Sequence, residues 1–172
     1  MCLTEQEARE YKEYLENLAA TKSDQMFSNG GKDHAVVLYS VLLNHANLSA
    51  RFFCECAESE IWQNPIFRTA LVNALRKADF QVQILVRQNN NPDFEWLPKE
   101  LNERVKVKII TEENLNKINN HFCTDSCNFS VFDHDMFRFE YDVVGYKAYG
   151  SFNGPDAGES MAKLFDECFN AA

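Results

Sequence analysis

Residues 127–153, CNFSVFDHDMFRFEYDVVGYKAYGSFN, carry the pattern around which the rest of the chain is arranged. Asn128–Asp133 and Met136–Tyr141 alternate large apolar residues with polar ones, the period of two that is typical of half-buried strands. A third run, Tyr146–Tyr149, follows. Turn-forming residues at 133–135 and at Gly145 separate the three runs. We name residues 127–153 the terminal hairpin and expect three strands from it.

Composition limits the class of protein. The chain has 172 residues, 45% of them hydrophobic and 13% aromatic, which is typical of one globular domain. A net charge of −9 disfavours sequence-independent binding to nucleic acid, because phosphate binding needs clustered Lys and Arg. No stretch reaches the apolar length of a membrane span, and the first residues, MCLTEQE, lack the features of a signal peptide. We therefore expect a cytoplasmic protein that does not bind membranes.

The remaining elements predict an α/β fold. Thr4 and Glu7 form a capping box that begins a surface helix within residues 1–21. Strand and helix patterns then alternate, which predicts parallel neighbours joined by right-handed crossovers. We expect one α/β domain over residues 1–172, with helices on both faces of a mixed sheet that is parallel at its centre and antiparallel toward the terminal hairpin. The segments behind this expectation are strands at 24–28, 50–56, 80–86 and 105–110, helices at 35–46 and 65–77, a helical turn at 111–115, a loop at 117–125 and a last helix from Pro155.

Six cysteines lie in apolar runs, and we expect them to be reduced and mostly buried. The alternative is a zinc site built from two pairs of cysteines with His121. No C-x-x-C spacing supports that site, so we expect no metal and no cofactor. The cysteines in question are Cys54, Cys56, Cys123 and Cys127.

Two glycine-bearing turns are candidate anion sites. Asn29, Gly30 and Gly31 lead into a helix that begins near His34, and backbone amides at such a turn bind anions. Alternatively, these glycines are needed only to form the turn and bind no ligand. The second turn, Gly150–Asn153, precedes the last helix, and its Ser151 and Asn153 either face a ligand or cap that helix. We expect both turns at the carboxyl ends of strands, on one rim of the sheet.

Charged residues of the terminal hairpin are further candidates. Arg138 and Glu140 share one face of a strand, and the guanidinium suits a phosphate or carboxylate. Solvated pairing of these charges across strands is the alternative. Asp133, with His134 and Asp135, forms either an acid/base or metal cluster or an ordinary turn.

An early strand, glycine turn and helix, followed by a late strand ending in Asp133 and by Gly150-Ser-Phe-Asn153, resemble the phospholipase D-like phosphodiesterase superfamily. The resemblance covers most of the chain loosely and residues 126–169 best. The superfamily motif is H-x-K-x4-D, followed by G-S-x-N. Alignment on Asp133 places Ser126 where the nucleophilic histidine belongs and Asn128 where the phosphate-binding lysine belongs. The resemblance therefore implies the fold and a homodimer, but not the superfamily's covalent route.

These observations lead to one functional expectation and two alternatives. We expect a non-catalytic binding or regulatory module, a pseudoenzyme, with a vestigial phosphate pocket near Asn29, Gly31, His34, Ser151 and Asn153. The first alternative is a phosphodiesterase or nuclease in which His34 or His121 acts as a relocated nucleophile or base. The second is a structural subunit of a larger assembly.

Overall fold

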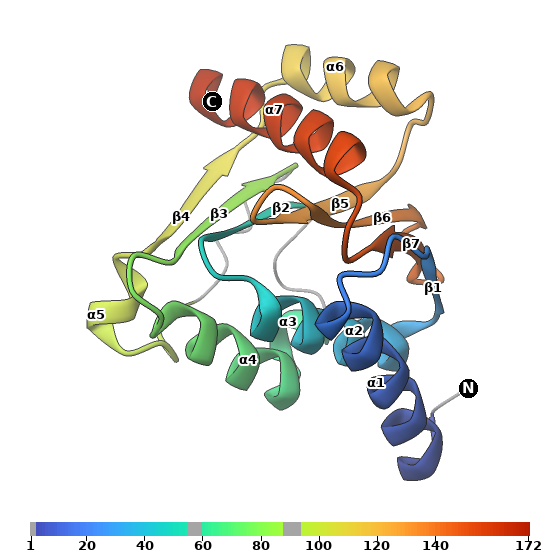
Figure 1. Cartoon of the computed structure of the whole chain (residues 1–172). Helices are drawn as coiled ribbons and strands as arrows, with labels where there is room; N and C mark the ends of the chain where they lie inside the picture. The colour runs from blue at the N-terminus through green and yellow to red at the C-terminus, as the bar shows by residue number, and fades with distance from the viewer. Residues whose placement is uncertain (1–2, 55–59, 88–93) are drawn as a thin grey trace.

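The computed structural model describes residues 3–54, 60–87 and 94–172. One sheet of seven strands has helices on both faces, which confirms the predicted α/β class (Figure 1). The strands are β1 (Phe27–Gly30), β2 (Ser49–Cys54), β3 (Gln81–Val86), β4 (Val105–Ile109), β5 (Asn128–Phe132), β6 (Met136–Asp142) and β7 (Lys147–Ser151). The helices are α1 (Glu5–Ala20), α2 (Lys32–His45), α3 (Glu60–Gln63), α4 (Pro65–Leu75), α5 (Lys99–Asn102), α6 (Glu112–Phe122) and α7 (Pro155–Ala171).

The strand order is β1-β7-β6-β5-β2-β3-β4. Among the described strands, only β2, β3 and β4 pair in parallel, and they form one side of the sheet. The prediction of a parallel centre is therefore wrong. The three strands of the terminal hairpin separate β1 from β2, so β1 pairs antiparallel with β7 at the far edge. The order of elements along the chain predicted the strands, but it could not show that the late hairpin would occupy the middle of the sheet.

Each face of the sheet has its own apolar core. Neighbouring strand residues point to opposite faces, so Phe52 packs into the core beneath α1, α2 and α4, whereas Phe53 packs into the core beneath α6 and α7. Figure 1 shows α6 and α7 on one side of the sheet and α1–α5 on the other. Because helices cover both faces, a charged side chain in the middle of the sheet is removed from water on either face.

The predicted capping box is present at α1. The Thr4 side chain accepts a hydrogen bond from the Glu7 N–H at 3.2 Å, and the Glu7 carboxylate accepts from the Thr4 N–H at 2.9 Å. This helix packs against α2, and its buried side chains are Leu15, Leu18 and Ala19. Within the described ranges, no helix is both long enough and apolar enough to cross a membrane.

The predicted loop at residues 117–125 is wrong, because α6 continues to Phe122. Its buried Ile118 lies between the half-buried Leu115 and Phe122, at the helical spacings of three and four residues. Helix α6 ends at Cys123, whose φ of 52° is left-handed. Four asparagines among residues 114–120 weaken the helical pattern in the sequence.

Asp133 has a structural role at the turn between β5 and β6. Its φ is 54°, a left-handed conformation that Asp tolerates. Its carboxylate accepts backbone N–H bonds from Asn47 at 2.9 Å, Leu48 at 2.8 Å and Ser49 at 3.1 Å. Asp133 therefore links the hairpin turn to the start of β2. These hydrogen bonds explain the position of the Asp133 carboxylate without a bound ligand.

Candidate functional site

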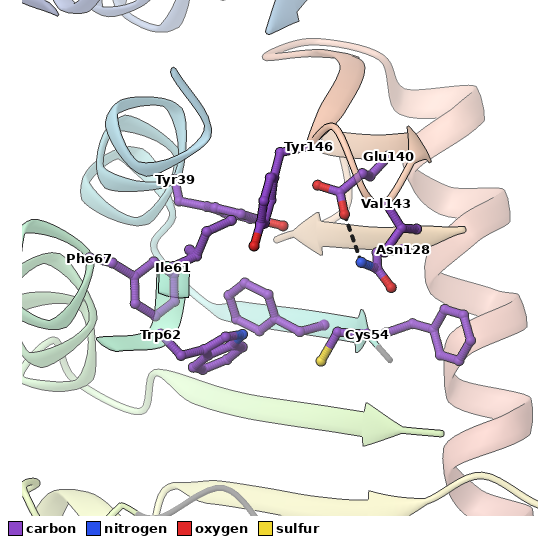
Figure 2. Close-up of a pocket in the computed structure, with 11 residues that line it drawn as sticks. Tyr39, Cys54, Ile61, Trp62, Phe67, Asn128, Glu140, Val143 and Tyr146 are labelled. Carbon is purple, nitrogen blue, oxygen red and sulfur yellow. Dashed lines mark hydrogen bonds between the residues drawn. The ribbon is translucent and has the colours of Figure 1, made fainter. Parts of the chain in front are cut away.

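A cavity of about 250 Å³ lies between the helices α2–α4 and the sheet. Figure 2 shows Tyr39, Trp62 and Phe67 on one side of this cavity and Asn128 and Glu140 on the other. We name it the aromatic cavity. Its lining residues are Tyr39, Phe52, Phe53, Cys54, Ile61, Trp62, Phe67, Asn128, Glu140, Val143 and Tyr146.

A buried polar network adjoins the aromatic cavity. Arg138, on β6, has no exposed surface. Its Nε donates to Asn29 Oδ1 at 3.2 Å, its Nη1 to the Tyr39 hydroxyl at 3.0 Å and its Nη2 to Glu140 Oε2 at 2.5 Å. The protein itself therefore occupies every nitrogen of the guanidinium.

The same network ties four segments of the chain together. Asn29, at the end of β1, donates from Nδ2 to the Tyr146 carbonyl oxygen at 2.5 Å. The second oxygen of Glu140, Oε1, accepts from Asn128 Nδ2 at 2.7 Å. Strands β1, β5 and β6 and the turn before β7 are thus held together by side-chain bonds as well as by the backbone ladder.

Burial and charge shift the pKa values in this network in opposing ways. Burial would lower the pKa of Arg138, but the combined effect of Tyr39 and the Glu140 carboxylate raises it, so the guanidinium stays charged. Burial raises the pKa of Tyr39 despite the opposing effect of Arg138, so the hydroxyl stays protonated. A neutral hydroxyl and a neutralised ion pair leave no net charge among these three groups.

The alternative of solvated pairing for Arg138 and Glu140 is wrong. The two residues lie on one strand, and they are 0% and 2% exposed. Because an anion from solvent has no route to the buried guanidinium, Arg138 does not act as an accessible phosphate ligand. The sequence showed the alternating charges on the strand. It did not show that α2 would cover that face of the sheet.

The two glycine-bearing turns do not converge, which corrects the prediction of a shared rim. In the β1–β7 pair, Gly30 lies opposite Lys147 and Phe27 lies opposite Gly150. At about 3.3 Å per residue, Gly31 and Ser151 are separated by roughly 16 Å along the strands. The pairing is antiparallel, so the carboxyl end of β1 meets the amino end of β7 instead of its carboxyl end.

The other predicted residues have local partners. The His34 ring packs edge-on against Tyr11, with 4.8 Å between ring centroids. Ser151 Oγ accepts from the Asn153 N–H at 3.1 Å, and Asn153 Nδ2 donates to the Lys22 carbonyl oxygen at 2.9 Å. Gly31 has an extended φ of 174°, which any residue adopts. Of the predicted candidates, the structure brings Asn29, Arg138 and Glu140 together in the buried network, and Glu140 also lines the aromatic cavity.

Several residues of the cavity were missed as site residues. Tyr39, Trp62 and Phe67 lie on three different helices, and no pattern in the sequence singled them out. Asn128 was noted only as the position where the superfamily has lysine. One pattern in the sequence could have indicated the polar end of this cavity. Polar residues share one face of two otherwise apolar strands, namely Asn128 and Ser130 on β5 and Arg138 and Glu140 on β6.

The proposed zinc ligands are only partly described. Cys56 lies outside the described residues. Cys54 is half-buried, Cys123 is exposed and Cys127 is buried. Across residues 3–54, 60–87 and 94–172, no three His, Cys, Asp or Glu side chains gather as a metal site would require.

Comparison with family models and with curated proteins found no match. Among solved structures, the chain is similar to TrmBL2, described as an archaeal chromatin protein with a novel mode of DNA binding. The TM-score is 0.59 at 11% sequence identity, over 95% of this chain and 61% of TrmBL2. This chain therefore spans about three fifths of the length of that protein, and the likeness shows the fold alone.

This comparison contradicts two functional expectations. A structural neighbour that binds DNA contradicts both the phosphate-pocket pseudoenzyme and the exclusion of nucleic acid as a partner. It gives no support to the homodimer or to a small phosphate-containing ligand. Kinship with the phospholipase D-like superfamily stays a prediction, which the comparison with TrmBL2 does not support.

Proposed function

We propose that this chain is a component of a DNA-bound protein or assembly and that it contacts the DNA backbone directly. The observation that carries the proposal is the fold shared with a DNA-binding chromatin protein over 95% of the chain. The shared fold covers only part of that protein, so the surface that meets DNA has to be argued from the residues of this chain.

The net charge of −9 requires that any DNA contact be local. Several cations are already engaged by protein groups. Arg51 Nε contacts Asp166 at 2.7 Å, and Lys32 pairs with Glu60. Arg104 Nη1 donates to the carbonyl oxygen of Lys77 at 2.7 Å. A DNA-binding surface must therefore combine accessible Arg or Lys with an absence of neighbouring carboxylates.

The exposed side of α4 meets this requirement along the helix itself, although Lys12 on α1 is followed by Glu13 and, one turn on, by Glu16. Residues 61–78, which include the helix, contain no Asp or Glu. Two shallow grooves flank the helix and share Thr69 and Asn73. Within the described part of the chain, no carboxylate lines either groove. We name as the α4 surface the polar and basic residues of the two linings, Lys12, Asn44, Arg68, Thr69, Asn73 and Arg76, together with Trp96.

The side chains of the α4 surface suit phosphate contacts. The Arg68 guanidinium lies 4.6 Å from the centroid of the Trp96 ring, and its Nε donates to the Trp62 carbonyl oxygen at 3.0 Å. With the bond from Nη2 to Gln63 Oε1, these contacts engage two of the three nitrogens of the guanidinium and hold it in place. Thr69 and Asn73 are exposed and one helical turn apart, and Arg76 is exposed at the end of the helix. Arg, Lys, Thr and Asn are among the side chains that contact DNA phosphates in known complexes.

Fluorescence anisotropy of a labelled duplex of about 24 base pairs tests the proposal. At about 50 mM salt we expect a dissociation constant in the range of about 10⁻⁶ to 10⁻⁴ M, which is typical of sequence-independent binding. Three phosphate contacts give a log–log salt slope of about −2.7, so affinity should fall by about 40-fold between about 50 and 200 mM salt. No change in anisotropy at about 100 μM protein in low salt would overturn the proposal.

A further inference from the structure

We propose that the aromatic cavity binds an uncharged, flat compound of about two fused rings that carries one hydrogen-bond donor. This inference is independent of DNA binding, because the cavity and the α4 surface share no residue. It rests on the volume of the cavity, the arrangement of its rings and the charge state of its polar end.

The volume sets the size of the compound. A cavity of about 150 Å³ lined by apolar side chains is enough to bind benzene. The aromatic cavity measures about 250 Å³, which adds room for a second fused ring. Larger cofactors and nucleotides need the greater volumes that are usual for their sites.

The walls favour an aromatic compound. Phe52 and Trp62 pack with 5.1 Å between centroids at an interplanar angle of 68°, and Trp62 and Phe67 with 4.8 Å at 64°. These edge-to-face pairs hold one another in fixed orientations around the cavity. A further ring is accommodated by the same offset or edge-on contacts, which add to the gain from apolar burial.

The polar end favours a neutral donor. Glu140 lines the cavity, but Arg138 already balances its charge, and Oε1 accepts from Asn128. An anion would meet carboxylate and amide oxygens without reaching the guanidinium behind them. A cation would add a charge beside an ion pair that is already neutral. A hydroxyl or ring N–H has an acceptor here, since a carboxylate oxygen accepts more than one hydrogen bond.

Proton–nitrogen NMR with 2-naphthol as the probe tests the proposal. The chain has two tryptophans, so Trp96→Phe assigns the remaining indole N–H signal to Trp62. We expect a saturable shift of the Trp62 signal by 2-naphthol, with naphthalene-2-sulfonate at least about tenfold weaker because burying its charge is unfavourable. No shift of Trp62 at millimolar probe, or equal affinity for the sulfonate, would overturn the proposal.

Two neighbouring valines provide a matched pair of variants. Val143 lines the cavity, whereas Val144 is 93% exposed. We expect Val143→Trp to weaken 2-naphthol binding at least about tenfold and Val144→Trp to leave it unchanged, because only the first ring can fill the cavity. Equal binding by the two variants would place the probe elsewhere and refute the proposal.

A second variant keeps the test decisive if Val143→Trp does not fold. Asn128→Leu replaces the amide at the polar end with an apolar group of similar size. We expect it to strengthen 2-naphthol binding by about tenfold and to leave naphthalene binding within about twofold, because Glu140 Oε1 loses its bond from Asn128 and accepts the hydroxyl of the probe instead. If both probes respond equally, the polar end does not recognise the donor and the proposal fails.

Discussion

Arg138 is the residue on which the interior of this fold most depends. A fully buried guanidinium is tolerated only when its charge is balanced and its nitrogens are bonded, and here Asn29, Tyr39 and Glu140 bond to all three nitrogens. Because these partners occupy the guanidinium, Arg138 is not available to bind a phosphate. The sequence showed the charged residues on the strand, but only their burial beneath α2 showed that they form an internal ion pair.

Removing one member of the ion pair should be far more harmful than removing both. We expect Arg138→Met to lower the free energy of unfolding by about 3–5 kcal/mol, because Glu140 is left buried and unpaired. The double variant Arg138→Met/Glu140→Leu should recover most of that loss. Urea denaturation at neutral pH measures both. A double variant as unstable as the single one would show that the damage does not arise from the unpaired carboxylate.

Tyr39 makes the free energy of unfolding depend on pH in the alkaline range. Burial raises its pKa, so above about pH 10 the unfolded chain loses this proton while the folded chain keeps it. The unfolded state then binds fewer protons, and stability falls as pH rises. Tyr39→Phe should make the fall shallower, by up to about 1.4 kcal/mol per pH unit.

Urea denaturation from about pH 8 to 11 measures the effect of Tyr39→Phe. The variant also loses the bond from Arg138 Nη1, so its whole curve should lie lower at neutral pH. As a control, Tyr149→Phe removes the hydroxyl of a side chain that is 40% exposed, and its curve should run parallel to that of the wild type. Parallel curves for Tyr39→Phe as well would contradict the assignment.

At the scale of elements, the β1–β7 pair depends on a glycine without a side chain. A Cβ on Gly150 would lie 2.0 Å from the Phe137 carbonyl oxygen and 2.6 Å from Phe27 Cζ. The backbone oxygen belongs to the neighbouring strand and cannot move away. This glycine was predicted as part of an anion-binding turn, and the structure assigns it to close packing between strands.

Gly150→Ala should therefore destabilise the protein by about 3 kcal/mol, because overpacking here displaces a strand. The control is Gly30→Ala, since nothing lies within 4 Å of a Cβ at that position. We expect Gly30→Ala to change the free energy of unfolding by less than about 0.5 kcal/mol. Thermal or urea denaturation compares the two. Similar losses in both variants would contradict the packing role of Gly150.

Local patterns predicted elements better than they predicted contacts between elements. Alternation predicted β5 and β6, the run at Tyr146–Tyr149 predicted part of β7, and the capping box at Thr4 predicted the start of α1. Helix α6 was cut short because its asparagines masked the apolar spacing of Leu115, Ile118 and Phe122. Cavity residues such as Trp62 and Phe67 lie on separate helices, and only tertiary packing brings them together.

At the scale of the whole molecule, the sheet order could not be read from the chain. The pairing of β1 with β7 joins residues more than 100 positions apart, and no local pattern specifies that partner. The consequence reaches the candidate site. With β7 between β1 and β6, Asn29 and Arg138 meet in the buried polar network beside the aromatic cavity, while the antiparallel β1–β7 pairing keeps Gly31 and Ser151 apart.

Charge distribution links the whole molecule to its proposed partner. A chain with a net negative charge can bind DNA only where its local electrostatic potential is positive. The α4 surface combines Lys12, Arg68 and Arg76, and no carboxylate lines its two grooves in the described part of the chain. In Figure 1, α4 and α7 lie on opposite faces of the sheet. A charge change on α7 therefore alters the net charge without altering the proposed contact.

The most direct test compares Arg76→Glu with Lys163→Glu by DNA anisotropy at about 50 mM salt. Both residues are exposed, and each substitution changes the net charge by −2, from −9 to about −11. The account predicts about a tenfold loss of affinity and a salt slope smaller by about 1 for Arg76→Glu, and less than about a twofold loss for Lys163→Glu. Equal losses in the two variants, or an unchanged affinity in Arg76→Glu, would contradict DNA contact through the α4 surface.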